Sequence, residues 1–76
     1  MEFKIVPNPA NRGQCCTFKK GDKYYWADKS WVSDAYCFET MIFPSDADGN
    51  VTDWGEVYCD RTDKSLVACI QEFLAS

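Results

Sequence analysis

Carboxylates are concentrated in one segment of the sequence, and their type and spacing suggest a chemical role most clearly. Six of them fall between residues 46 and 63, namely Asp46, Asp48, Asp53, Glu56, Asp60 and Asp63. Residues 38–76 carry eight acidic and two basic side chains, whereas residues 1–37 carry four acidic and six basic ones, and the net charge is −4. A negative surface repels phosphate and attracts basic partners. The segment is a candidate surface for a basic protein, and the alternative is a solvated face that keeps the chain in solution.

The sequence lacks the residues on which many catalytic and metal sites depend. It contains no histidine, which excludes nucleophile–histidine pairs, histidine acid–base catalysis and histidine metal ligands. Its cysteines form no C-x-x-C pair, so we expect no structural zinc. Neither of the glycine-rich nucleotide-binding fingerprints occurs. We therefore predict a protein that is not an enzyme and that holds no metal and no cofactor.

The run Asp46-Ala47-Asp48-Gly49-Asn50 resembles part of a calcium-binding loop. Aligning Gly49 with the invariant glycine of such loops puts Pro44 at the first ligand position and Gly55 at the last. Neither residue supplies a side-chain ligand, and the last position requires a bidentate glutamate. A hairpin turn explains the run better.

The five cysteines do not form the pattern of a secreted disulfide framework, because their number is odd and Cys15 and Cys16 are adjacent. The N-terminus lacks the features of a signal peptide, and no apolar run reaches the length of a membrane span. We expect a cytoplasmic protein with reduced thiols that are mostly small core residues. A redox role for Cys15 and Cys16 is the open alternative.

A second candidate site lies in the N-terminal half, where basic and aromatic residues alternate. Its members are Lys20, Lys23, Tyr24 and Trp26. Rings that stack on bases beside cations that hold phosphates are typical of nucleic-acid binding. A pI near 4.5 argues against direct nucleic-acid binding, since such domains are usually basic. A small anionic ligand such as a nucleotide stays possible at this site.

The pattern of apolar residues predicts an α+β fold, an antiparallel β-meander of four to five strands with one C-terminal helix packed on one face. We expect a single domain over residues 1–76, because this length supports one small core. The expected strands cover residues 2–6, 15–18, 23–28, 36–43 and 51–59, with proline ending the first at Pro7 and the fourth at Pro44. In residues 23–28, Tyr24 and Trp26 should face one way and Tyr25 and Ala27 the other.

The C-terminal segment has helical periodicity. Apolar residues recur at three- and four-residue spacing, at Leu66, Val67, Cys69, Ile70, Phe73 and Leu74. Asp63 or Thr62 is the expected N-cap. One short helix covers one face of a sheet, so the other face should be solvated, covered by loops or used for binding. With an aromatic share of 16%, we expect an exposed aromatic patch there.

Residues 38–43, 48–54, Glu56, Tyr58 and Arg61 carry a family resemblance. The segments E-T-M-I-F and D-G-N-V-T-D-W, followed by a helix, are similar to small uncharacterised proteins encoded by phages and prophages of gut Firmicutes. The resemblance covers residues 36–75 and implies the topology. It also suggests an inhibitor of bacterial defence, resembling anti-CRISPR proteins, some of which present carboxylates in place of DNA phosphates.

The leading hypothesis is a phage-type, non-enzymatic inhibitor of a host protein with a basic surface, such as a defence or nucleic-acid-handling protein. Its predicted partner-binding residues are Asp46, Asp48, Asp53, Trp54, Glu56, Tyr58 and Asp60. The carboxylates would steer association, while Trp54 and Tyr58 would be the apolar anchors. The alternatives are a protein that sequesters a nucleotide or other small ligand, and a structural module that forms a homo-oligomer. The expected location is the cytoplasm of a bacterial host cell.

Overall fold

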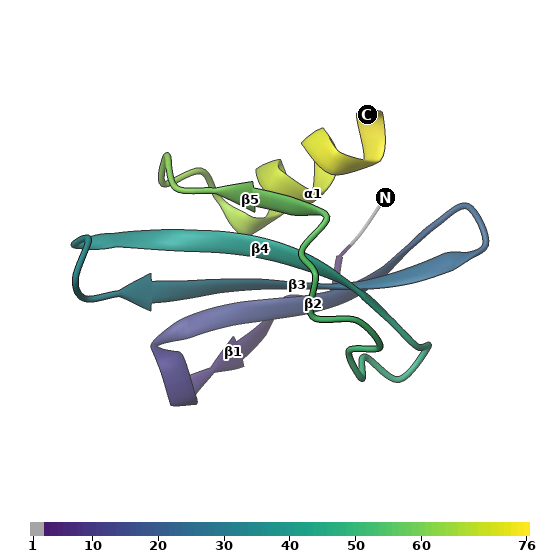
Figure 1. Ribbon diagram of the computed structural model, residues 1–76, viewed down its shortest axis with the longest axis horizontal. Coiled ribbons are helices and arrows are strands. Elements are labelled where there is room, and N and C mark those ends of the chain that lie inside the picture. The colour runs from purple at the N-terminus through teal and green to yellow at the C-terminus, as the bar shows by residue number, and fades with distance from the viewer. Residues whose placement is uncertain (1–2) are drawn as a thin grey trace.

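The computed structural model describes residues 3–76 and shows an antiparallel sheet with one C-terminal helix on one of its faces (Figure 1). The five strands follow chain order across the sheet, β1-β2-β3-β4-β5. The elements are β1 Val6–Asn8, the 3-10 helix η1 Pro9–Asn11, β2 Gly13–Lys20, β3 Lys23–Val32, β4 Cys37–Ser45, β5 Tyr58–Asp60 and α1 Leu66–Ala75. The predicted α+β meander with a C-terminal helix is confirmed.

The two faces of the sheet differ, and the predicted alternation in β3 is confirmed. The helix-facing side and α1 form the core, made of Cys16, Phe18, Ala27, Ile42, Leu66, Ile70 and Phe73. Tyr25 packs against this core, where its ring meets Phe73 at 4.9 Å between centroids. Tyr24 and Trp26 lie on the opposite face. α1 contacts β2 and β3 on the core side of the sheet. The opposite face, called the open face from here on, has to be covered by another part of the chain.

The central strands are longer than predicted. β3 continues past Asp28 to Val32, because β4 pairs with it from Tyr24 to Val32, where the last pair is Val32 with Cys37. β4 also continues through Pro44, which was predicted to end it. The carbonyl oxygen of Pro44 accepts a hydrogen bond from the amide of Thr52. The backbone polar groups of Pro44 therefore face away from β3, and its missing N–H costs no bond to that strand.

The first strand begins later than the predicted residues 2–6, of which Glu2 lies outside the described residues. Phe3 and Ile5 precede the strand and pack against the core. Pro7 lies within β1 and pairs with Gln14, so it does not stop the strand. β1 is an edge strand, where the missing proline N–H is tolerated.

The helix α1 begins at Leu66, and its N-cap is Ser65. The hydroxyl oxygen of Ser65 accepts the amide hydrogen of Ala68 at 3.1 Å. The predicted caps, Asp63 and Thr62, are wrong, because Asp63 adopts a left-handed φ of 67° and the Thr62 hydroxyl bonds to Asp60. The apolar periodicity is confirmed, since Leu66, Cys69, Ile70 and Phe73 are buried.

The predicted last strand over residues 51–59 is mostly a loop. Only Tyr58–Asp60 pairs with β4, apart from a single bridge between Ser45 and Val51. Residues 46–57, called the acidic lobe from here on, lie on the side of the sheet opposite α1 (Figure 1). The ring of Trp54 packs edge-to-face on Phe43 of the open face, with 5.2 Å between centroids. The lobe thus covers part of the face that the helix leaves open.

The close approach of Gly49 to β2 gives the first testable prediction. A Cβ at Gly49 would lie 2.5 Å from the Thr17 hydroxyl oxygen, whereas a Cβ at Gly21 would meet nothing within 4 Å. Both glycines have positive φ, 87° and 65° respectively. Gly21→Ala should therefore cost about 1 kcal/mol of unfolding free energy from backbone conformation alone. Gly49→Ala should cost at least about 1 kcal/mol more from the clash.

Urea unfolding of the two variants and the parent chain measures the difference. Equal losses in Gly49→Ala and Gly21→Ala would show that the lobe does not rest on Thr17.

Candidate binding surfaces

The acidic lobe brings together most of the predicted partner-binding residues. Asp46, Asp48, Asp53, Trp54 and Glu56 are all exposed in it. Trp54 has 70% of its surface exposed even though one part of its ring packs on Phe43. Val57 adds a second exposed apolar side chain. The arrangement is a large, exposed ring among carboxylates.

The first turn of the lobe is held by the carboxylate of Asp46. One of its oxygens accepts the amide hydrogens of Asp48 and Asn50, both at 2.9 Å, and the other accepts the Asn50 side-chain amide at 3.2 Å. These bonds, above all the one from the Asn50 backbone, lower the pKa of Asp46. Backbone bonds between Asp46 and Asn50 and between Gly49 and Asp46 close the same turn, as expected for a hairpin turn. Within residues 3–76 no group of carboxylates and thiols is arranged to hold a metal ion.

Tyr58 and Asp60, the remaining predicted members, do not join this surface. Both lie on β5, on the side of the sheet that faces α1. The ring of Tyr58 packs edge-to-face on Phe73 at 6.3 Å, and its hydroxyl donates to the Glu72 carboxylate at 3.1 Å. Burial raises the pKa of Tyr58. The predicted strand over residues 51–59 would have placed Trp54 and Tyr58 on one face, but residues 51–57 are not a strand, so the two predicted anchors are separated.

Asp60 has local partners of its own. Its carboxylate accepts the hydroxyl hydrogen of Thr62 at 2.8 Å and pairs with Lys64 at 3.8 Å. Lys64 also pairs with Glu72 of α1 at 2.6 Å. These contacts connect β5, the following loop and the helix, so Asp60 has a structural role in this arrangement.

The structure separates the members of the alternative ligand site. Lys23 and Tyr24 line a hollow of about 460 Å³ together with Asp22, Tyr25, Pro44, Ser45, Thr52 and Val57. Trp26 stacks on Phe43 of the open face, with 6.2 Å between centroids. Lys20 lies under the C-terminal end of α1, where its ammonium donates to the carbonyl oxygens of Phe73 and Ser76, both at 3.0 Å. Only Lys23 and Tyr24 of this set meet at one hollow.

The cysteines are free thiols, four of them on strands of the sheet and Cys69 on α1. Cys15 is half-buried and Cys16 is buried, and as neighbours in β2 they point to opposite faces. Burial raises the pKa of Cys16 and of Cys59, which lowers the thiolate fraction of both. A raised thiol pKa is unfavourable for nucleophilic or redox chemistry.

A second hollow was not predicted from the sequence. It is lined by Pro7, Arg12, Gly13, Gln14, Lys29 and Phe38. Arg12 and Lys29 belong to the basic residues of the N-terminal half. The pairing of β2 with β3 brings their segments together, and their spacing in the sequence does not reveal this. The sequence does show that Lys29 and Trp31 are two residues apart in a strand, which places a cation and a ring on one face of the sheet.

Comparison of the chain with models of known protein families, with curated proteins and with solved structures finds no match. The resemblance to phage proteins therefore stays a prediction. Over the part of the chain that the structure describes, no helix is both long enough and apolar enough to cross a membrane.

The lowered pKa of Asp46 predicts a pH dependence of stability. Its pKa in the folded chain is below the unfolded value of about 3.9. The stabilisation by its ionised form is therefore present above the unfolded pKa and is lost as pH falls through the folded one. The urea concentration at the unfolding midpoint should be lower at about pH 3 than at about pH 6, and the decrease should be smaller in Asp46→Asn.

Asp48→Asn is the matched control, because the Asp48 carboxylate accepts none of the turn's hydrogen bonds given by the residues described. This variant should keep the pH dependence of the parent chain. An Asp46→Asn curve that follows the parent would assign the acid sensitivity to other carboxylates.

The position of Lys20 under the helix C-terminus predicts a loss of stability when it is replaced. Lys20→Met keeps the apolar stem but removes the bonds to the helix carbonyls and the ammonium 4.5 Å above the Phe73 ring. We expect a loss of about 1 kcal/mol in unfolding free energy. Lys23→Met, a change at an exposed position in the next strand, should stay within about 0.5 kcal/mol of the parent.

Proposed function

We propose that this chain is a non-enzymatic binding protein that engages a basic surface of another protein through its acidic lobe, residues 46–57. The observation that carries the proposal is Trp54, a large ring left 70% exposed in a segment rich in carboxylates. Tryptophan is among the residues that contribute most to binding when a partner buries it.

The local packing of Trp54 supports this role. Its ring rests edge-to-face on Phe43, whose own side chain is 8% exposed and belongs to the sheet. A ring held in this way has already lost part of its conformational freedom before a partner arrives. Binding then costs less entropy than it would for a ring on an unsupported loop.

The charges of the lobe are available to a partner. Ion pairs in the described part of the chain use Glu39, Asp60 and Glu72, and none of these lies in the lobe. Asp53 accepts only the amide hydrogen of Gly55 among the bonds described, and Glu56 is exposed. Uncompensated negative charge around an apolar anchor favours a basic partner and accelerates association at low salt.

A basic partner also fits the role that the family resemblance suggests. A protein that handles nucleic acid presents lysines and arginines to phosphates, and a lobe of carboxylates can occupy such a surface in their place. We propose inhibition of a host protein of this class as the biological outcome.

The proposal is tested by capturing partners of the immobilised chain from a nuclease-treated bacterial lysate and measuring each captured protein against variants. Trp54→Ala should weaken binding by at least about 2 kcal/mol, roughly 30-fold in Kd. The double change Asp53→Lys with Glu56→Lys should weaken it and flatten its salt dependence.

Two control variants make the result specific to the lobe. Tyr36→Ala removes a ring that is 83% exposed at the turn between β3 and β4, and Asp22→Lys with Asp34→Lys reverses two exposed charges outside the lobe. Both controls should bind like the parent chain, and all variants should melt as cooperatively as it does. A partner that binds the lobe variants and the controls equally well would contradict the proposal.

A further inference from the structure

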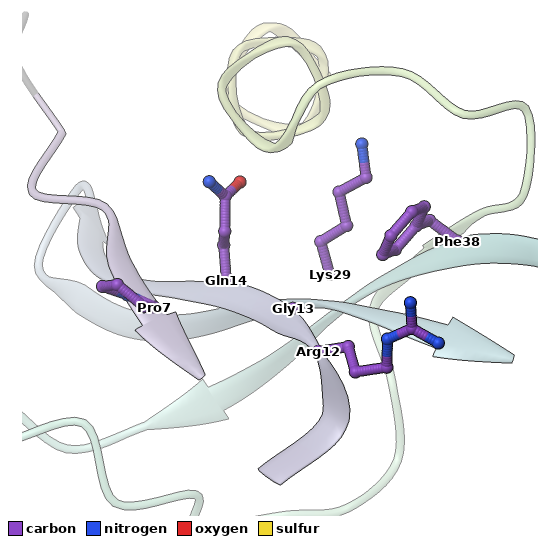
Figure 2. A pocket seen from close by; sticks show the side chains of 6 residues that line it. All are labelled: Pro7, Arg12, Gly13, Gln14, Lys29 and Phe38. Carbon is purple, nitrogen blue, oxygen red and sulfur yellow. The ribbon is translucent and has the colours of Figure 1, made fainter. Parts of the chain in front are cut away.

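The helix-facing side of the sheet contains a hollow at the end of α1 where the helix begins. It has a volume of about 340 Å³ and is lined by Pro7, Arg12, Gly13, Gln14, Lys29 and Phe38. Figure 2 shows Gln14 and Lys29 rising from the sheet toward the helix, with Phe38 beside Lys29 and the guanidinium of Arg12 close by. The volume lies at the lower end of the range of small-molecule sites.

The register of the strands brings these side chains to one face. Gln14 of β2 is paired with Lys29 of β3, and Phe38 of β4 is paired with Trp31, two residues after Lys29. Arg12 is a non-glycine residue with a left-handed φ of 60°, directly after η1. This backbone turn directs the chain from η1 into β2, so that the Arg12 side chain borders the hollow.

The hollow is positively charged in a chain that is acidic as a whole. Arg12 and Lys29 line it, and among residues 3–76 no carboxylate does. The ion pairs found in the described part of the chain use Arg61 and Lys64 as their cations, and neither Arg12 nor Lys29. The Lys29 ammonium donates to the carbonyl oxygen of Lys64 at 3.0 Å, which fixes its position and uses one of its three N–H groups.

The same two cations flank a pair of aromatic rings. Trp31 and Phe38 pack edge-to-face with 5.2 Å between centroids. The Arg12 guanidinium lies 5.9 Å from the Trp31 centroid, and the Lys29 ammonium lies 5.2 Å from the Phe38 centroid. Rings beside cations offer both a stacking surface and charge-assisted donors.

We infer that this hollow is a binding site for a small phosphate monoester that carries a planar ring. The phosphate would accept hydrogen bonds from the Arg12 guanidinium, the remaining Lys29 N–H groups and the Gln14 amide. The ring would lie against Phe38. Two separate cations favour a doubly charged phosphate over a single carboxylate.

The inference does not depend on the proposed partner surface. The side chains of the hollow rise on the α1 side of the sheet (Figure 2), and the acidic lobe lies on the opposite side (Figure 1). A failure of either proposal leaves the other in place. The site also differs from the hollow at Lys23 and Tyr24, which includes the carboxylate of Asp22.

Phenyl phosphate is the probe, and phenol and inorganic phosphate are its two halves as controls. The labelled chain is titrated at a pH above the second pKa of the ester, about 6, while backbone amide shifts are followed by NMR. Phenyl phosphate should shift the amides of Gly13, Gln14 and Phe38 saturably. Its Kd should be at least roughly tenfold lower than that of either control, because both the charge and the ring contribute.

Arg12→Gln should raise the Kd for phenyl phosphate roughly tenfold. Arg12→Asn is a second variant and should raise the Kd in the same way. Asparagine tolerates the left-handed backbone of this position, so the variant removes the charge without straining the turn. Lys23→Gln makes the same change of charge in the other hollow and should leave the Kd unchanged.

Three results would overturn the inference. The first is the absence of saturable shifts at the Gly13, Gln14 and Phe38 amides. The second is binding of inorganic phosphate as tight as that of phenyl phosphate, which would show that the ring has no site. The third is a Kd that responds to Lys23→Gln and not to the Arg12 variants, which would place the ligand at the other hollow.

Discussion

The rest of the structure depends on one packing constraint: a single helix of ten residues can cover only one face of a five-stranded sheet. α1 packs on β2 and β3 and closes the core on one face. The rings of Trp26 and Phe43 are on the other face, which the helix cannot reach. Other parts of the chain must shield this face from water, and the acidic lobe covers Phe43 by placing Trp54 on its ring. The exposed anchor of the proposed partner surface is thus also part of the cover of the sheet.

This double role limits how the lobe can work. A cover has to stay in place: the hydrogen bonds of Asp46 fix the shape of the lobe's first turn, and the close approach of Gly49 to Thr17 sets that turn against β2. Between these points and β5, Asp53 and Glu56 are exposed and carry little of the packing. Charge can therefore change along residues 53–56 with less effect on the fold than a change of Trp54 would have. A substitution of these carboxylates can therefore change the specificity for a partner with little change in stability. A substitution of Trp54 affects both.

The parts of the fold that could be predicted from the sequence are those set by local periodicity. Alternation in β3 identified the faces of Tyr24 and Ala27, and the three- and four-residue spacing identified the buried side of α1. The lobe could not be predicted in this way, since residues 51–57 have apolar residues that also suit a strand. The turn bonds of Asp46 and the contact of Gly49 with β2 decide its path, and the second of these joins residues far apart in sequence. The hollow at Arg12 and Lys29 was missed for the same reason, because it depends on the pairing of β2 with β3.

The meander turns the charge asymmetry of the sequence into an asymmetry in space. The strands β2 and β3 and the turn before them come from the half that carries six basic and four acidic residues, while the lobe comes from the half with two basic and eight acidic ones. Since the lobe lies on the side of the sheet opposite α1 (Figure 1) and the Arg12 hollow lies on the α1 side (Figure 2), the sheet stands between the two charged regions. Interactions between exposed charges are largely screened beyond about 8 Å at physiological salt. A chain with a net charge of −4 can therefore keep a local site for an anion where the described lining of a hollow offers two cations, Arg12 and Lys29, and no carboxylate.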